Sequence, residues 1–216
     1  MPLLLLKQSA KAHKNKIYRY TIPIVGVMLA VLPLNSALAS PAEQLSNAAA
    51  EKESKSAFGT KGQKHWYVQG AVATTLNREE AFPRRFGLAG VGLSKFIFEA
   101  HSINLELNSI YFSQPSDDAL GLNLALLMRW HFVRKSNWTA FADAGAGVMG
   151  TTSDVPSRGA SFNFTPQAGA GFSLKLNEQR RLILGLRWHH ISHADLFGAN
   201  PGRDSIMGYV GLQFPR

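Results

Sequence analysis

The chain of 216 residues contains no cysteine. Disulfide bonds, a thiol nucleophile and a zinc site with sulfur ligands are therefore excluded. Any catalytic chemistry must use oxygen or nitrogen nucleophiles, or a metal ion held without sulfur.

The sequence beyond residue 39 also lacks long apolar runs. No stretch there is long enough to cross a bilayer as a helix. The first 39 residues contain five Lys or Arg and no acid, then an apolar run over residues 22–34, then Ala37-Leu38-Ala39. An uncleaved anchor is the alternative, but this run is shorter than the roughly 20 residues a spanning helix needs, and it contains Pro23 and Pro33. We therefore expect residues 1–39 to be a signal peptide, cleaved after Ala39.

The excess of positive charge belongs largely to this segment. The whole chain has a formal charge of +9, which falls to +4 once the five basic residues of 1–39 are removed. No basic stripe with interleaved aromatic residues remains, so nucleic acid is not an expected partner.

The composition of the mature chain changes near residue 65. Residues 40–64 are rich in Ala, Ser, Lys and Glu, with few large apolar side chains to bury, which predicts a flexible periplasmic N-terminal segment. Residues 65–216 alternate between apolar and polar side chains, and we expect them to form one outer-membrane β-barrel domain.

Alternating segments with turn signals between them recur along this domain. Alternation is clearest in the fourth segment, where Leu120, Leu122, Leu124, Leu126 and Met128 share one face of the expected strand. There are eight such segments, and an even number fits a closed barrel. The sequence therefore predicts an all-β fold, an eight-stranded antiparallel transmembrane β-barrel. The eight segments are 66–76, 85–97, 101–112, 120–133, 137–150, 161–175, 180–191 and 204–214.

Charged side chains fall on the opposite, interior face of several of these segments. They could form a proton or ion path, but we favour structural pairing, because unpaired interior charges would be costly. The expected interior group is Glu106, Arg129, His131, Asp143 and Arg187.

The connections between segments fall into two classes. Those near Glu99, residues 135–136 and residues 177–178 are short, whereas residues 77–84, 113–119, 151–160 and 192–203 form longer ones. Outer-membrane barrels have short periplasmic turns and longer external loops. We therefore expect both termini in the periplasm and the loop 192–203 outside the cell.

Three polar residues interrupt the apolar outer face of the last two segments. His190 and Ser192 share parity with Leu184 and Leu186, and Asp204 shares parity with the apolar residues of the last segment. A polar group facing lipid is destabilising unless it is satisfied. An acid, an imidazole and a hydroxyl that satisfy one another are the parts of a nucleophilic triad, and a triad on the outer face predicts a membrane lipid as substrate.

The segment His190-Ile191-Ser192, with Asn200 ten and Asp204 fourteen residues after the histidine, resembles the C-terminal motif of the PagL family of lipid A 3-O-deacylases. The resemblance implies that His190 is the general base, Ser192 the nucleophile and Asp204 the acid, with Asn200 helping to stabilise the oxyanion. It implies hydrolysis of the ester-linked 3-hydroxyacyl chain at position 3 of lipid A, with lipopolysaccharide as partner and no cofactor. A homodimer is left open.

This sequence departs from the family pattern at two positions. Asp204 is shorter than the Glu expected there, which changes its reach to His190 but keeps its charge. His193 stands where an Asn is expected after the nucleophile.

Two other hypotheses compete with the deacylase hypothesis. His189, His190, His193 and Asp195 have the residue types of a zinc or iron site, although His189 and His190 point to opposite faces of a strand. A non-enzymatic OmpA-like small barrel, structural or adhesive, would explain the strands and the interior charges. It would not explain the polar residues on the lipid-facing row.

Overall fold

The computed structural model describes residues 58–76, 85–198 and 200–216. The expected signal peptide, residues 40–57 and the connection 77–84 lie outside the described residues. The described residues form these strands: β1 Lys64–Thr75, β2 Arg85–Phe98, β3 His101–Ser113, β4 Ala119–Arg134, β5 Trp138–Val155, β6 Ala160–Phe164, β7 Gln167–Asn177, β8 Arg180–Ile191 and β9 Arg203–Pro215.

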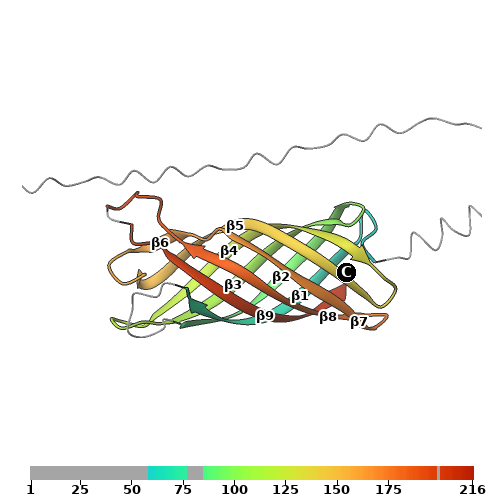
Figure 1. The fold of residues 1–216 in the computed structure, drawn as a ribbon, viewed down its shortest axis with the longest axis horizontal. Helices are drawn as coiled ribbons and strands as arrows, with labels where there is room; N and C mark the ends of the chain where they lie inside the picture. Colours follow the sequence, from blue (N-terminus) through green and yellow to red (C-terminus); the bar gives the residue numbers. More distant parts are fainter. Residues whose placement is uncertain (1–57, 77–84, 199) are drawn as a thin grey trace, which may run out of the picture. The chain divides into compact units, whose positions relative to one another are not determined.

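The strands close into an antiparallel barrel (Figure 1). Apart from β6 and β7, strands that follow one another in sequence pair with one another, and β1 pairs with β9 to close the ring. β6 and β7 both lie between β5 and β8 and together act as one strand. The predicted eight-stranded antiparallel barrel is therefore confirmed.

The break between β6 and β7 falls at Thr165 and Pro166. The register against β5 is the same on both sides, because Val148 faces Phe164 and Gly145 faces Gln167. Pro166 has no N–H to donate, so the ladder loses one bond there while the strand continues. The predicted single segment 161–175 is thus one strand with a gap in its hydrogen bonding.

The short and the longer connections lie at opposite ends of the barrel. Tight turns at residues 99–100, 135–137 and 178–179 join β2 to β3, β4 to β5 and β7 to β8. The C-terminus lies at this end (Figure 1), where the Arg216 N–H donates to the Lys64 carbonyl at 3.0 Å. The opposite end carries residues 114–118, 156–159, 192–198 and 200–202.

One expected loop was wrong in extent. Residues 151–160 were expected to form a long connection, but β5 continues to Val155 and β6 begins at Ala160. The side chain of Asn163 donates to the carbonyls of Val155 and Ala160, both at 2.8 Å, which supports the tip of this hairpin from within. The alternation that marks a strand is weak here, because residues 151–154 are all small or polar.

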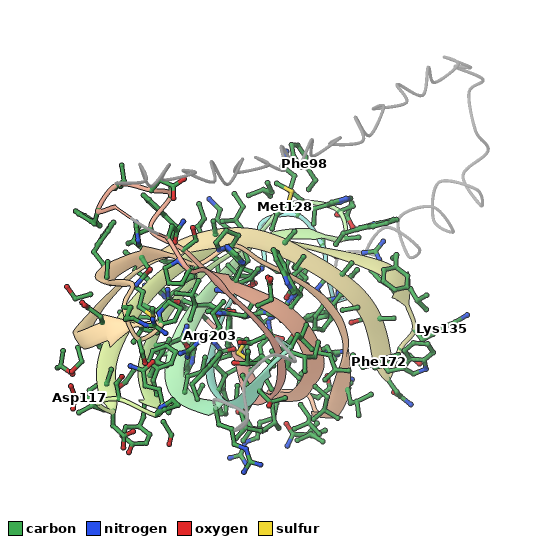
Figure 2. All side chains as sticks on the ribbon, turned by 60° about the vertical axis from the view of Figure 1, so that its left-hand side comes forward. Phe98, Asp117, Met128, Lys135, Phe172 and Arg203 are labelled. Atoms are coloured by element: carbon green, nitrogen blue, oxygen red, sulfur yellow. The ribbon has the colours of Figure 1, made fainter. Side chains whose placement is uncertain are left out.

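The outer face is a continuous apolar surface. Leu120, Leu122, Leu124, Leu126 and Met128 are each 47–62% exposed, and the residues between them on β4 point inward. Figure 2 shows Phe98 and Met128 projecting away from the barrel wall. Such a surface matches what a transmembrane barrel presents to lipid. Among the described residues, no helix is long and apolar enough to cross a membrane.

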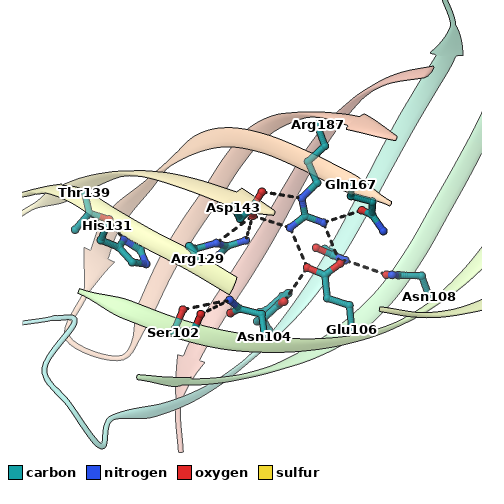
Figure 3. Close-up of polar contacts among 12 residues, drawn as sticks. Ser102, Asn104, Glu106, Asn108, Arg129, His131, Thr139, Asp143, Gln167 and Arg187 are labelled. Atoms are coloured by element: carbon teal, nitrogen blue, oxygen red, sulfur yellow. Dashed lines mark hydrogen bonds and ion pairs between the residues drawn. The ribbon is translucent and has the colours of Figure 1, made fainter. Parts of the chain in front are cut away.

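The barrel interior is held by charges rather than by an apolar core alone. Arg187 lies between Glu106 and Asp143, at 3.0 and 2.9 Å, and Arg129 donates to Asp143 at 2.8 Å (Figure 3). All four side chains are buried. The expected pairing of these residues is confirmed, but His131 does not join them. Its ring instead contacts the Thr139 hydroxyl at 2.8 Å, because its position on β4 lies nearer the short-turn end.

Small residues let large interior side chains fit the narrow barrel. Tyr67 on β1 lies directly across from Gly92 on β2, and a Cβ added to that glycine would lie 2.1 Å from the tyrosine ring. Only glycine permits this approach. The Tyr67 hydroxyl donates to Glu106 at 2.9 Å, which places the ring beside the interior charges.

The short-turn end is closed in part by residues just before β1. The Phe58 ring contacts the rings of His65, Phe96 and His131, with centroids 5.3 Å apart in each pair. The Arg181 guanidinium lies 4.0 Å from the centroid of the Phe58 ring. Residues 58–63 were expected within the flexible N-terminal segment. Their contacts with the barrel come from Phe58, a large apolar side chain in an otherwise polar stretch, and from backbone hydrogen bonds, among them Gly62 N–H to the Phe96 carbonyl at 2.8 Å.

Candidate active site

Three polar side chains lie on the outer face at the long-loop end of β8 and β9. His190 and Asp204 face each other directly across the two strands, and Ser192 continues the His190 row just beyond the end of β8. Each is partly exposed, whereas the alternating residues His189, His193 and Arg203 are buried. The structure therefore brings the three predicted triad residues to one outward-facing site.

The acid and the imidazole are in contact. His190 Nδ1 lies 2.8 Å from Asp204 Oδ1. Side chains directly opposite on antiparallel strands have Cβ atoms about 5 Å apart, so an aspartate is long enough to reach the ring. The shorter acid of this sequence is thus compatible with the pairing that a triad needs.

A tryptophan also contacts this pair. The Trp188 indole N–H donates to the same Asp204 oxygen at 2.9 Å. The indole stacks beside the His190 ring, with centroids 5.7 Å apart and planes 24° apart. Sequence reasoning missed this contact. The sequence does indicate that Trp188 lies near His190, because the two residues are two positions apart and share the outer face of the strand.

The Ser192 hydroxyl has two donors of its own. It accepts from Asn200 Nδ2 at 2.7 Å and from the Ala194 N–H at 3.1 Å. The Asn200 side-chain oxygen in turn accepts from the His193 N–H at 3.3 Å, which fixes the orientation of the amide. Asn200 therefore contacts Ser192, the expected nucleophile.

No hydrogen bond joins Ser192 Oγ to the His190 ring in the part of the chain that the structure describes. Residues two apart on a strand share a face, so the two side chains point in the same direction. Catalytic hydrogen bonds often shorten only when substrate binds. A rotation of the serine side chain away from Asn200 is the movement this site would need.

The connection after Ser192 has an unusual backbone. Ala194 and Asp195 have φ values of 53° and 60°, in the left-handed region that disfavours residues with a Cβ. Such conformations cost about 1–3 kcal/mol each and cluster at functional sites. Here they turn the Ala194 N–H back towards the Ser192 hydroxyl.

His193 supports this connection from its buried side. Its Nδ1 accepts from the Phe197 N–H at 3.4 Å, and the two rings have centroids 5.7 Å apart. Its backbone carbonyl also accepts from the Leu196 N–H at 3.1 Å. The histidine that replaces the expected asparagine therefore contacts its own loop.

The expected metal alternative does not correspond to one cluster. His189 is buried in the interior against Phe86, with centroids 5.2 Å apart, while His190 lies on the outer face. Asp195 is exposed in the loop. Across residues 58–76, 85–198 and 200–216, no group of three His, Asp or Glu residues is placed to hold a metal ion.

Comparisons with known proteins agree with the fold and name a family. The family model described as lipid A 3-O-deacylase (PagL) matches residues 58–213, more than half of the chain. A search among curated proteins finds no match.

Two solved structures illustrate the likeness in fold. The crystal structure of Neisserial surface protein A (NspA) has a TM-score of 0.56 at 14% identity, covering 71% of this chain and 97% of that one. The crystal structure of the outer membrane enzyme PagL has a TM-score of 0.54 at 19% identity, covering 69% and 99%. At these identities the structures show a shared small-barrel fold, while the family model carries the more specific information.

Proposed function

The chain belongs to the PagL family of lipid A 3-O-deacylases, and we propose that it performs this hydrolysis with Ser192 as nucleophile, His190 as general base and Asp204 as the acid. It is an outer-membrane β-barrel that removes the ester-linked 3-hydroxyacyl chain at position 3 of lipid A. The observation that supports the proposed residues is their convergence on the lipid-facing side of β8 and β9.

The first half of the reaction forms an acyl-enzyme. His190 takes the proton of the Ser192 hydroxyl as its oxygen attacks the ester carbonyl, and Asp204 stabilises the resulting imidazolium. The tetrahedral intermediate then collapses, the bond to the sugar oxygen breaks, and the imidazolium returns the proton to that oxygen. The 3-hydroxyl of lipid A leaves, and the acyl chain remains on Ser192.

The second half restores the enzyme. Water attacks the acyl carbonyl while His190 accepts one of its protons, and the intermediate collapses to release a 3-hydroxy fatty acid. The proton returns from His190 to the Ser192 oxygen. The scheme uses groups of this chain and one water molecule, and no cofactor takes part.

The developing oxyanion needs donors aimed near the nucleophile. Among the described residues, Asn200 Nδ2 and the Ala194 N–H donate to Ser192 Oγ, at 2.7 and 3.1 Å. When the serine oxygen moves to attack, both donors become free for the carbonyl oxygen. The His193 N–H keeps Asn200 oriented during this exchange.

We also propose how the chain lies in the membrane. Residues 1–39 would be removed on export, residues 40–64 would lie in the periplasm with both termini, and the loop after β8 would face outward. This orientation puts Ser192 in the outer leaflet, where lipid A resides.

The test is lipid A from cells producing equal amounts of folded barrel, analysed by mass spectrometry. Wild-type protein should remove one hydroxyacyl chain, and Ser192→Ala should leave lipid A unchanged while still migrating as a heat-modifiable barrel. An active Ser192→Ala protein would exclude Ser192 as the nucleophile.

A matched pair of histidines checks the strand parity. His190→Ala should lower turnover at least about a hundredfold, since loss of a triad member leaves only binding and oxyanion assistance. His189→Ala, at the neighbouring interior position, should retain turnover within about threefold. Equal losses in both variants would contradict the outward-facing site.

A further inference from the structure

Asp204 has two contacts at a single oxygen, and one of them comes from outside the proposed triad. Oδ1 lies 2.8 Å from His190 Nδ1 and 2.9 Å from Trp188 Nε1. No other hydrogen bond reaches this carboxylate within the described part of the chain. Because 43% of the Asp204 side chain is exposed, burial alone does not hold it in place.

The register explains why a tryptophan can reach the acid. Trp188 faces Ile206 and His190 faces Asp204, so Trp188 and Asp204 are diagonal neighbours on the outer face. Diagonal positions are about 7–8 Å apart, within reach of a long aromatic side chain. The aspartate is directly opposite His190, and the indole N–H extends to it from the next row.

Trp188 contacts both partners of the acid–base pair. Its ring lies beside the His190 imidazole at 24° between planes, and its N–H fixes the carboxylate oxygen that the imidazole contacts. A tryptophan on a lipid-facing row can pack there without a polar partner, but a buried or half-buried indole N–H usually finds one. Here the partner is the proposed catalytic acid.

We propose that Trp188 is a positioning residue for the deacylation reaction, holding Asp204 in the orientation that directs the His190 ring. The proposal rests on the proposed triad. It assigns Trp188 a role in turnover and none in substrate binding, because its N–H contacts the acid and not the nucleophile.

Trp188→Phe tests this role, because phenylalanine keeps an aromatic ring in the outer row but lacks the N–H donor and the second ring of the indole. A hydrogen bond to a charged group is worth more than a neutral one, and partial exposure reduces that value. We therefore expect kcat to fall about tenfold while KM changes less than about twofold.

Trp130→Phe is the matched control. Trp130 is also a half-exposed outer-face tryptophan stacked beside a histidine, His101, with centroids 6.1 Å apart and planes 9° apart, at the short-turn end of the barrel. Its replacement should leave kcat and KM unchanged. Equal kinetics for the two Phe variants would overturn the role of Trp188, as would a rise in KM with unchanged kcat.

A second measurement does not depend on activity. The chain has four tryptophans, and indole N–H resonances of the labelled barrel in micelles can be assigned by the two Phe variants. The Trp188 resonance should shift upfield in Asp204→Asn, while the Trp130 resonance should stay in place. An unmoved Trp188 resonance would overturn the hydrogen bond.

The activities of Ser192→Ala and Trp188→Phe together distinguish a wrong role for Trp188 from a wrong triad. Full activity in Ser192→Ala would overturn the triad and with it any role of Trp188 in turnover. An inactive Ser192→Ala with unaffected Trp188→Phe would overturn the role of Trp188 alone. In an Asp204→Asn background, Trp188→Phe should cause no further loss, because the group that it positions is gone.

Discussion

At the residue scale, Asp204 is the position where charge and reach can be separated. Its carboxylate contacts His190 Nδ1 at 2.8 Å from the directly opposite position on β9. Asp204→Asn keeps the shape, loses the charge and can favour the wrong imidazole tautomer, so the initial rate of 3-hydroxyacyl release should fall at least about a hundredfold. Asp204→Glu keeps the charge and should stay within about tenfold of wild type.

The control for this series is Asp195→Asn, in the loop after Ser192. Asp195 is exposed, and its replacement should leave the rate nearly unchanged. Near wild-type activity in Asp204→Asn would exclude an essential carboxylate at position 204 and make Asp195 the acid to examine.

Sequence parity could predict which residues share the site, because period-two alternation places side chains on one face or the other. It could not predict the contacts within the site. The bond from Trp188 to Asp204 depends on the register between β8 and β9, and the bonds of Asn200 depend on left-handed residues in the loop. Neither the register nor those φ values follows from local alternation.

At the element scale, the interior charges tie together strands that are not neighbours. Arg187 on β8 contacts Glu106 on β3 and Asp143 on β5, each within 3.0 Å. Removing one partner of a buried ion pair leaves an uncompensated charge, which typically costs 3–5 kcal/mol. Each charge of this network therefore depends on its partners across the diameter of the barrel.

Arg187→Met should lower the free energy of unfolding by about 3–5 kcal/mol, measured by tryptophan fluorescence during urea unfolding in micelles. Arg180→Met, at an exposed position on the same strand, should change it by less than about 0.5 kcal/mol. A similar midpoint for both variants would show that the interior pairs contribute little.

The interior charges also show which features of the barrel the alternation of the sequence predicts. Glu106, Arg129, Asp143 and Arg187 could be grouped from parity alone, since each is an inward-facing charge that needs a partner. His131 shares that parity but lies further along β4, beside Thr139 and Phe141. Depth within the barrel depends on strand stagger, which alternation does not specify.

At the scale of the whole molecule, the two ends of the barrel differ in the length of their connections. The proposed orientation puts the turn at residues 178–179 in the periplasm and the connection 114–118 outside the cell. Because the chain contains no cysteine, single cysteines can report this directly. Asp117→Cys should react with a membrane-impermeant maleimide on intact cells, whereas Gln179→Cys should react only after the outer membrane is permeabilised.

Both positions are exposed in the structure, so the contrast between them reports the side of the membrane and not burial. The reverse labelling pattern would place both termini outside and would remove Ser192 from the leaflet that contains lipid A.

The outward direction of Ser192, His190 and Asp204 has a consequence for how the proposed reaction responds to concentration. The three side chains lie on the outer face of β8 and β9 and not in an enclosed cleft, so the proposed triad would meet lipid A within the plane of the surrounding leaflet. Its rate should follow the mole fraction of lipid A among the neighbouring lipids. Adding inert amphiphile at constant total lipid A would then slow turnover by surface dilution, and a competitive inhibitor would need to partition into the leaflet before it could reach the serine.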